Sequence, residues 1–362
     1  MSIKNLLEIN SYKVFLISII ICILFYYFER LIGIDQFYHP DTLYYLNSEE
    51  KYYYFKSIFL ERPLATLNNG FLFVLKIFNH NYNQLIIFNF VIFSLTNLIV
   101  YNLVFKDNLL SFNKFQIFIL YTILFFDPYR LHLAGHILKE TLLIFLILSF
   151  LYFKNLYVKM IFIFLGVFIK KNIIFYFFIF YIDDLIQKFF KIKKKLILPI
   201  SVLIIICLFL FFFKFTIFDQ EKSIFSYFTL LPNQSFIETL EIWHYRSMGG
   251  RDYDNVPNFQ NISFPLALIY KIIIWPSLII SGFFLFFTNS FLFKILGLLM
   301  IYFNVGIYYL TKKSFMNIGL LILLILIALY SVSFTSYFRY SYVAIYCSIV
   351  FFFSNLYKCQ KK

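Results

Sequence analysis

Asp41 is the side chain in this sequence best suited to acid–base chemistry. It lies in the segment FYHPDTLYYL (37–46), shortly after the first apolar stretch, and a carboxylate there can take the proton of an acceptor hydroxyl. The same residue would also serve as the N-cap of a helix that begins at Thr42, because its carboxylate can accept a backbone N–H. The sequence leaves both roles open, and they are compatible with each other.

Arginine is rare in this chain, and its positions indicate where a phosphate group would bind. Only six of the 32 basic residues are arginine, and a guanidinium group can hold phosphate through two parallel hydrogen bonds. The segment IWHYRSMGGRDYD (242–254) places Arg246 and Arg251 around two glycines, which would let the backbone approach a ligand, although an ordinary exposed turn explains it equally well. We expect Arg246 and Arg339 to act with Asp41 in catalysis. The expected phosphate-binding residues are Arg130, Lys139, Lys170, Lys171 and Arg251.

Histidine and cysteine do not predict a metal or cofactor site. His132 and His136 are four residues apart and would share a helix face, but the zincin pattern requires glutamate at position 133, which is leucine. The four cysteines show neither metal-ligand spacing nor a disulfide framework. No nucleotide, haem or flavin signature occurs, so we expect no cofactor.

The composition places these groups in a membrane protein. The chain is 62% hydrophobic and 14% charged, with a mean hydropathy of +0.80, whereas about a quarter of the residues in soluble domains are charged. Long uncharged runs such as 196–213 are typical of membrane-spanning helices. The net charge of +14 reflects lysines in short loops and does not indicate nucleic acid. We therefore predict an all-α, polytopic integral membrane protein with one domain, 1–362.

Lysines set the expected topology. Lys4 and Lys13 precede the first apolar run and place the N-terminus in the cytoplasm. Two larger loops, about 29–83 and 214–265, then face outward, and 64–78 is expected as an interfacial helix. The stretch 264–287 is interrupted by a lysine and a proline, so it either lies at the interface or dips into the membrane. About 10–12 spans result, including those near 84–105, 115–126, 138–153, 160–169, 173–182, 196–213, 291–310, 316–331 and 342–355.

All six arginines fall on the outer face in this topology, although the positive-inside rule predicts the reverse. The asymmetry favours a phosphate-bearing ligand on that side, while chance placement of so few residues would give the same pattern. The turn at Lys170 and Lys171, between two short spans, lies on the outer side as well. These lysines would attract an anion or simply extend toward the lipid headgroups.

The chain resembles membrane glycosyltransferases. A first span followed by an outer loop with an acidic residue, HPDTLYYL (39–46), and the short spans around residue 171 are similar to the GT-C superfamily. The stretch DPYRLHLAGHILKETLLIFLIL (127–148) resembles a segment of Wzy-type polymerases of O-antigen and capsule repeat units. There a polar turn with an adjacent lysine and acidic residue, here Lys139-Glu140, enters an apolar helix. The loop at 214–265 and Arg339 are polymerase-like too.

The resemblance implies a bacterial inner-membrane enzyme that polymerises undecaprenyl-diphosphate-linked oligosaccharide repeat units at the periplasmic face. It implies polyprenyl-linked oligosaccharide and membrane lipid as partners, together with a chain-length regulator and a flippase. A GT-C transferase with a polyprenyl-monophosphate donor is the alternative, and some of these enzymes use a divalent cation. A flippase or transporter, for which internal repeats would be expected, and a membrane subunit without catalysis are further alternatives.

Overall fold

The computed structural model describes residues 11–61, 69–105 and 126–170, two strands within 214–223, and single residues or pairs within 115–122, 173–177, 294–298 and 342–354. The chain divides into two compact units, Met1–Ile173 with Val350–Lys362, and Ile174–Ile349. The described part is helical, apart from strands β1 (Lys214–Ile217) and β2 (Gln220–Ser223). These strands pair antiparallel in the second unit, within the polar stretch for which the sequence predicts a loop.

Two long apolar helices, α2 (Ser11–Leu31) and α6 (Tyr82–Val100), form the frame of the first unit. A π-helical stretch, η2 (Tyr101–Phe105), continues α6. Within the residues that the structure describes, these two helices are long and apolar enough to cross a membrane, since a bilayer core of about 30 Å needs about 20 residues of helix. Much of the α2 surface is apolar and exposed, which is the kind of surface that lipid covers.

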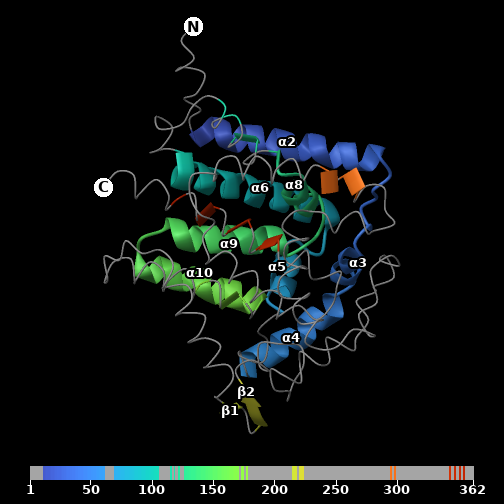
Figure 1. Ribbon diagram of the computed structural model, residues 1–362. Coiled ribbons are helices and arrows are strands. Elements are labelled where there is room, and N and C mark those ends of the chain that lie inside the picture. The colour runs from blue at the N-terminus through green and yellow to red at the C-terminus, as the bar shows by residue number, and fades with distance from the viewer. Residues whose placement is uncertain are drawn as a thin grey trace, which may run out of the picture. The chain divides into compact units, whose positions relative to one another are not determined.

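Helices α2 and α6 run antiparallel, side by side (Figure 1). Near the N-terminal end of α2, Asn97 Nδ2 donates to Ser18 Oγ at 2.9 Å. At the opposite end, Arg30 Nη2 donates to Tyr82 Oη at 2.8 Å. The segment 32–81 therefore leaves and re-enters this pair at one end, which we call the loop end.

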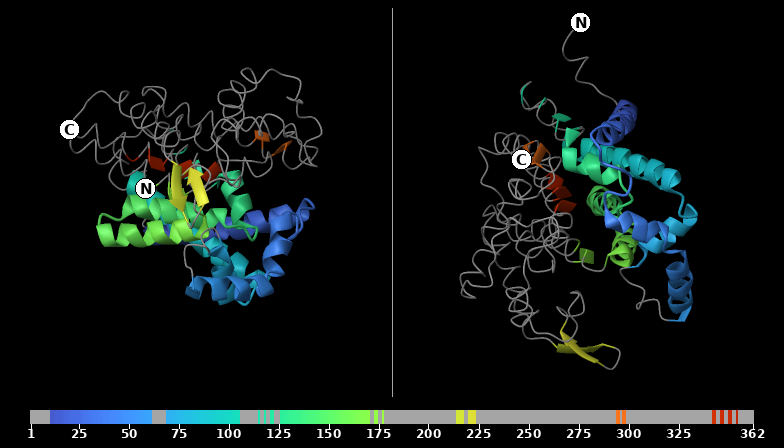
Figure 2. Two further views of the ribbon diagram at one scale, coloured as in Figure 1. Left: turned by 90° about the horizontal axis from the view of Figure 1, so that it is seen from below. Right: turned by 90° about the vertical axis from the view of Figure 1, so that its right-hand side faces the viewer.

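Three short helices follow at the loop end: α3 (Pro40–Leu46), α4 (Glu49–Glu61) and α5 (Phe71–Ile77). Helix α4 buries none of its residues and extends away from the long helices (Figure 2). Seven residues of α5 cover only about 10 Å, which is too short for a span. The structure thus confirms a short helix within 64–78, although residues 62–68 lie outside the described part.

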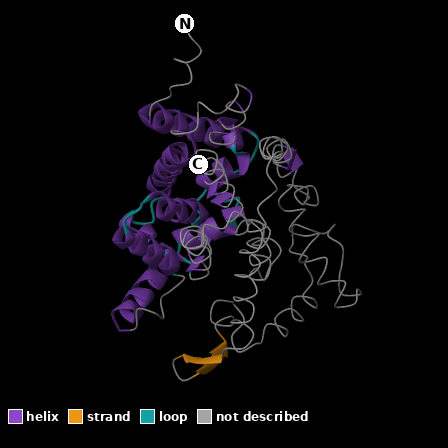
Figure 3. Ribbon diagram, turned by 60° about the vertical axis from the view of Figure 1, so that its left-hand side comes forward, coloured by secondary structure: helices purple, strands orange, loops and turns teal. Residues whose placement is uncertain are grey.

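The polar segment before the next hairpin forms α8 (Pro128–Ala134), and the hairpin consists of α9 (Glu140–Tyr152) and α10 (Leu156–Ile169). Their connections are short, as the teal segments in Figure 3 show. Asn155 caps α10 by accepting the Tyr157 N–H at 2.8 Å, so α10 begins four residues earlier than the sequence predicts. Helix α9 matches the predicted 138–153 closely, and both helices are shorter than a straight span requires.

The C-terminal end of α10 returns to the loop end. The Gly70 N–H donates to the Phe168 carbonyl oxygen at 3.0 Å, and the Phe71 ring lies 5.0 Å from the Tyr45 ring of α3. Any Cβ at position 70 would overlap the Phe168 ring, so this approach requires glycine. Lys170, directly after α10, therefore lies at the same end as the first loop, as the predicted topology requires.

Candidate functional site

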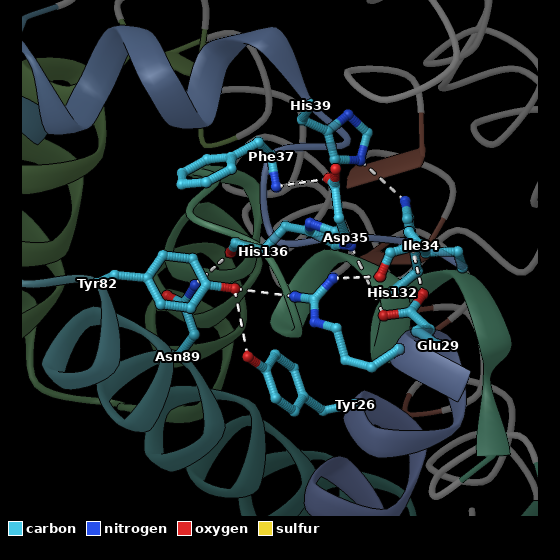
Figure 4. A network of polar contacts seen from close by, with 11 residues as sticks. Tyr26, Glu29, Ile34, Asp35, Phe37, His39, Tyr82, Asn89, His132 and His136 are labelled. Atoms are coloured by element: carbon cyan, nitrogen blue, oxygen red, sulfur yellow. Dashed lines mark hydrogen bonds and ion pairs between the residues drawn. The ribbon is translucent and has the colours of Figure 1, made fainter. Parts of the chain in front are cut away.

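Two polar segments that are far apart in the sequence meet at the loop end. One comprises the last turn of α2 and the loop into α3, and the other is α8 with the turn that follows it. His132 Nδ1 lies 2.5 Å from Glu29 Oε1, and His132 Nε2 lies 2.8 Å from His39 Nε2 (Figure 4). We call Glu29, His39, His132 and His136 the histidine cluster.

Hydrogen bonds fix the end of α2 from which Glu29 extends. Arg30 Nη1 donates to the Ile34 carbonyl at 2.5 Å, while its Nη2 reaches Tyr82. The Ile34 N–H donates back to the Glu29 carbonyl at 2.9 Å, and Gly33 takes a positive φ of 88° in this turn. Glycine adopts that conformation without the steric cost that a side chain would bring. The turn therefore holds Glu29 toward α8.

Local signals also explain the position of His132. Asp127 caps α8 by accepting the N–H groups of Tyr129 and Arg130 at 3.2 and 3.1 Å, and Pro128 occupies the first turn. Both features favour a helix start at this point. The short helix then ends at Gly135, and Asn89 Nδ2 donates to the His136 carbonyl at 2.7 Å, which ties the following turn to α6.

The cluster is buried and only partly hydrogen-bonded. Glu29, His132 and His136 are fully buried, and His39 is half-buried. Glu29 Oε2 and both ring nitrogens of His136 lack a hydrogen-bond partner. His136 Nε2 lies 3.6 Å from Glu29 Oε2, too far for a good hydrogen bond. Buried polar atoms without partners are costly, and an ion or water is one common explanation for them.

Gly135 makes room for the Glu29 carboxylate. A Cβ at this position would lie 2.9 Å from Glu29 Oε2. That separation is shorter than van der Waals contact, so a side chain here would push the carboxylate away from the two histidines. Gly135 has an ordinary helical φ of −75°, so space, rather than backbone conformation, is what glycine provides.

The environment determines which chemistry the cluster can do. Burial lowers the pKa of His136 to about 4, so its imidazole is neutral at physiological pH. Neutral imidazole nitrogens are metal ligands, and one ligand atom from each of His39, His132 and His136 lies within 4.8 Å of the others. The alternative is a hydrogen-bonded chain that holds a proton between Glu29 and His39.

Sequence reasoning missed this cluster. The four-residue spacing of His132 and His136 was visible, but it gave no indication that His39, 93 residues away from His132, completes the group. One signal pointed to Glu29, since a carboxylate in the last turn of an apolar helix is costly in lipid and usually has a partner.

Asp41, the expected catalytic base, lies in the first turn of α3, two residues after His39, and its side chain is half-buried. Helix α3 begins at Pro40 with His39 at the N-cap position, so the interpretation of Asp41 as the cap of a helix starting at Thr42 is wrong. The helix starts earlier because proline is favoured in the first turn. Its role as a base stays a prediction.

The expected phosphate-binding residues occupy different environments. Arg130 is buried: its Nη2 donates to Asn97 Oδ1 at 2.7 Å and its guanidinium lies 4.4 Å from the Phe93 ring centroid. Lys139 is half-buried at the N-cap position of α9, and Lys170 is half-buried just after α10. The structure thus gives Arg130 a helix-tying contact and leaves the two lysines nearer the surface. Lys171, Arg246, Arg251 and Arg339 lie outside the described residues.

Comparison with known proteins identifies no relative of this chain. No protein-family model, curated protein or solved structure is significantly similar to the chain.

Proposed function

We propose that this chain is a membrane glycosyltransferase of polysaccharide assembly, which polymerises undecaprenyl-diphosphate-linked oligosaccharide repeat units at the periplasmic face of a bacterial inner membrane. One observation carries the proposal: the loop with Asp41 and the segment 127–140 meet at the loop end, through His132 and its contacts with Glu29 and His39. These are the two stretches whose residues resemble the transferases and the polymerases.

The membrane arrangement is part of the proposal. In this arrangement α2 and α6 cross the bilayer as an antiparallel pair, with segment 32–81 on one side and the N-terminus on the other; the contacts at the two ends of the pair support it. The positive-inside rule then assigns the loop end to the periplasm. The remaining eight to ten spans are proposed from the apolar runs of the sequence.

In the proposed reaction, the acceptor sugar hydroxyl attacks the anomeric carbon of the lipid-linked donor. A new glycosidic bond forms as the bond from that carbon to the diphosphate oxygen breaks, and Asp41 takes the hydroxyl proton. Cations near the departing diphosphate stabilise its developing charge. We assign this role to Lys139 and Lys170, which lie nearer the surface than Arg130, and to Arg246, Arg251 and Arg339 from the rest of the chain.

Two observations favour the alternatives. The three histidines, one of which lies two residues before Asp41, would suit a GT-C transferase that uses a polyprenyl-monophosphate donor with a divalent cation. Buried ionisable groups such as Glu29 and Arg130 are also typical of transporters, where they line substrate or proton pathways. A transporter would move intact lipid-linked units across the bilayer and would form no glycosidic bond.

The decisive experiment is elongation by the purified full-length protein in liposomes that contain lipid-linked repeat units. We expect the wild-type protein to form longer lipid-linked chains and Asp41→Asn to be slower by about 10²–10⁴-fold, the usual contribution of a general base. The matched control is Asp35→Asn, because Asp35 is exposed and its side chain accepts the Phe37 N–H, which asparagine can also do.

Other outcomes separate the alternatives. Single sugar additions from a polyprenyl-monophosphate donor would identify the GT-C reaction instead. Protection of unextended lipid-linked units from an external probe, without elongation, would identify transport. Equal rates for Asp41→Asn and wild type would remove Asp41 from the mechanism.

A further inference from the structure

Three imidazole rings and one carboxylate converge at the loop end. The ring centroids of His132 and His136 are 4.6 Å apart. The centroid of the His39 ring lies 5.0 Å from that of His132 and 4.9 Å from that of His136. One ligand nitrogen from each ring lies within 4.8 Å of the other two. The rings come from two segments, the loop before α3 and the region of α8, so tertiary structure rather than helix spacing brings them together.

Two members of this group, Glu29 and His136, keep buried polar atoms that no hydrogen bond satisfies. His39 and His132 share one contact between their Nε2 atoms at 2.8 Å, in which one ring donates and the other accepts. His136 remains fully buried with both ring nitrogens unpartnered, and Glu29 Oε2 is buried without a hydrogen bond. A neutral imidazole has one N–H and one lone-pair nitrogen, so each of the three histidines can offer one electron pair, an arrangement that a cation would stabilise.

We infer that His39, His132 and His136 form a transition-metal site of the zinc class, and that Glu29 orients His132 for it. Imidazole nitrogen is a preferred ligand of Zn²⁺, and three histidines with an open fourth position are a known arrangement for it. The inference does not depend on the proposed glycosyltransferase activity, because it follows from the side chains alone.

Glu29 has the place of the carboxylate that commonly supports a metal-binding histidine. His132 Nδ1 donates to Glu29 Oε1 at 2.5 Å, which directs the other nitrogen, Nε2, toward His39. Such a contact fixes the tautomer and orientation of the ring and strengthens it as a ligand. Gly135, which leaves space for the carboxylate, supports the same geometry.

Metal binding requires movements in two directions, because the contact between His39 and His132 must open and any pair of ligand atoms near the limit of 4.8 Å must close. Zn–N bonds of about 2.0–2.1 Å in a tetrahedral site separate the nitrogens by about 3.3 Å. The contact of 2.8 Å between His39 and His132 must therefore open by about half an ångström. His39 can move because it is half-buried in the loop before α3, whereas His132 and His136 are fully buried. The fourth position would then take water or an oxygen of a ligand on the side of His39.

The test is metal binding by the full-length protein, purified in detergent through a tag without histidine, stripped with chelator and reloaded with Zn²⁺ or Co²⁺. We expect one bound ion per chain by elemental analysis, and visible Co²⁺ bands of a nitrogen-coordinated, four- or five-coordinate site. His39→Gln and His136→Gln should abolish tight binding. Glu29→Gln should retain the ion but weaken its affinity about 10–100-fold.

His80→Asn is the matched control. His80 lies outside the cluster and contacts the Tyr45 carbonyl, and asparagine tolerates its positive φ of 54°. It should bind metal as the wild-type protein does. A wild-type protein that binds neither ion would overturn the inference, as would full binding by folded His39→Gln protein or equal loss in His80→Asn.

Misfolding of a variant does not weaken the test, because the wild-type spectrum is decisive alone. X-ray absorption of the zinc-loaded wild-type protein should show imidazole nitrogens at about 2.0–2.1 Å, and a shell of oxygen or sulfur only would contradict the site. A protein that binds zinc but elongates no glycan would refute only the proposed function, and elongation without metal binding would refute only the metal site.

Discussion

Glu29 and His132 lie 103 residues apart in the sequence, and their side chains join at 2.5 Å with no exposed surface on either. This contact ties the end of the first long helix to α8 and positions the ring that faces His39. Removing one member leaves a buried polar group without its partner, and that loss generally costs more than the pair contributes in net terms.

The first prediction concerns this pair. Glu29→Ala and His132→Ala should each lower the thermal stability of the purified protein, and the double variant should be more stable than the sum of the two losses implies. We expect a coupling of about 0.5–3 kcal/mol, the usual range for residues in direct contact. Denaturation of the four proteins in one detergent measures it, and additive effects would show that the contact does not contribute.

Gly135 gives the second prediction. Gly135→Ala should destabilise the protein and weaken metal binding, because the new methyl group displaces Glu29 Oε2 from the histidine cluster. The control is the same substitution in a Glu29→Ala background, where the clashing atom is absent. There the cost should disappear, since alanine adopts the φ of −75° at this position without strain. A cost of the same size in both backgrounds would place the strain elsewhere.

The third prediction separates a structural cation from substrate-binding ones. Arg130→Gln should lower stability, because it removes the guanidinium that donates to Asn97 Oδ1 and stacks on Phe93. Lys139→Gln and Lys170→Gln, at half-buried positions, should keep the melting temperature and reduce elongation. Melting curves and elongation rates on the same preparations decide this, and a normal melting temperature together with slower elongation for Arg130→Gln would argue for direct phosphate contact.

Local signals allowed much of the helical structure to be predicted, while the site depended on contacts that they do not encode. Asp127 followed by Pro128, and Asn155 before an apolar run, cap helices in the structure. The predicted spans used neither signal, and the one near 160–169 begins four residues after α10 does. The apolar run at 138–153 became α9. The pairing of Glu29 with His132 could not be predicted, because helix periodicity specifies which residues share a face and not which faces meet.

Asp41 illustrates the same limit on a smaller scale. Its position in a polar loop after an apolar run was enough to suggest a role in chemistry, and its type suggested a helix start. The sequence did not show that His39, at the N-cap position of α3, points to a histidine from α8. The loop therefore also supplies His39, whose contact with His132 the sequence did not predict.

The fourth prediction uses pH. The hydrogen bond to Lys76 lowers the pKa of Glu49 below its ordinary value of 4.5, and the pKa of Lys76 is raised above 10.5 by the same contact and by Tyr53. A carboxyl group whose pKa is lowered by folding adds stability at pH above its unfolded pKa. That stability is lost as the pH falls through the folded pKa. A raised lysine pKa adds stability that disappears as pH rises through its folded value.

The contact between α4 and α5 should therefore be strongest between about pH 5 and 10. The protection factors of the α4 amides, which are exchange rates corrected for the intrinsic effect of pH, should be highest in that window and should fall on the acid side. Glu49→Gln should remove the fall in protection at acidic pH. Glu50→Gln, on the same exposed turn, should leave that fall unchanged. If protection still falls at acidic pH in Glu49→Gln, another titrating group causes the pH dependence.

The last prediction tests the membrane arrangement on which the proposed reaction depends. In a cysteine-free variant that remains stable, single cysteines at Asp35, Asp41 and Lys170 should react with an impermeant thiol reagent added to intact spheroplasts. Lys170 belongs to this set because the hydrogen bond between Gly70 and Phe168 brings the end of α10 to the loop end. A cysteine at Lys13, in the first turn of α2, should react only after the membrane is opened, since α2 is long enough to separate the two sides. Cysteines at Arg246 and Arg339 should react in intact spheroplasts, as those at Asp35, Asp41 and Lys170 do. Labelling of Asp41 and Arg339 from opposite sides would leave the carboxylate and the arginine unable to act on one diphosphate, and the proposed mechanism would fail.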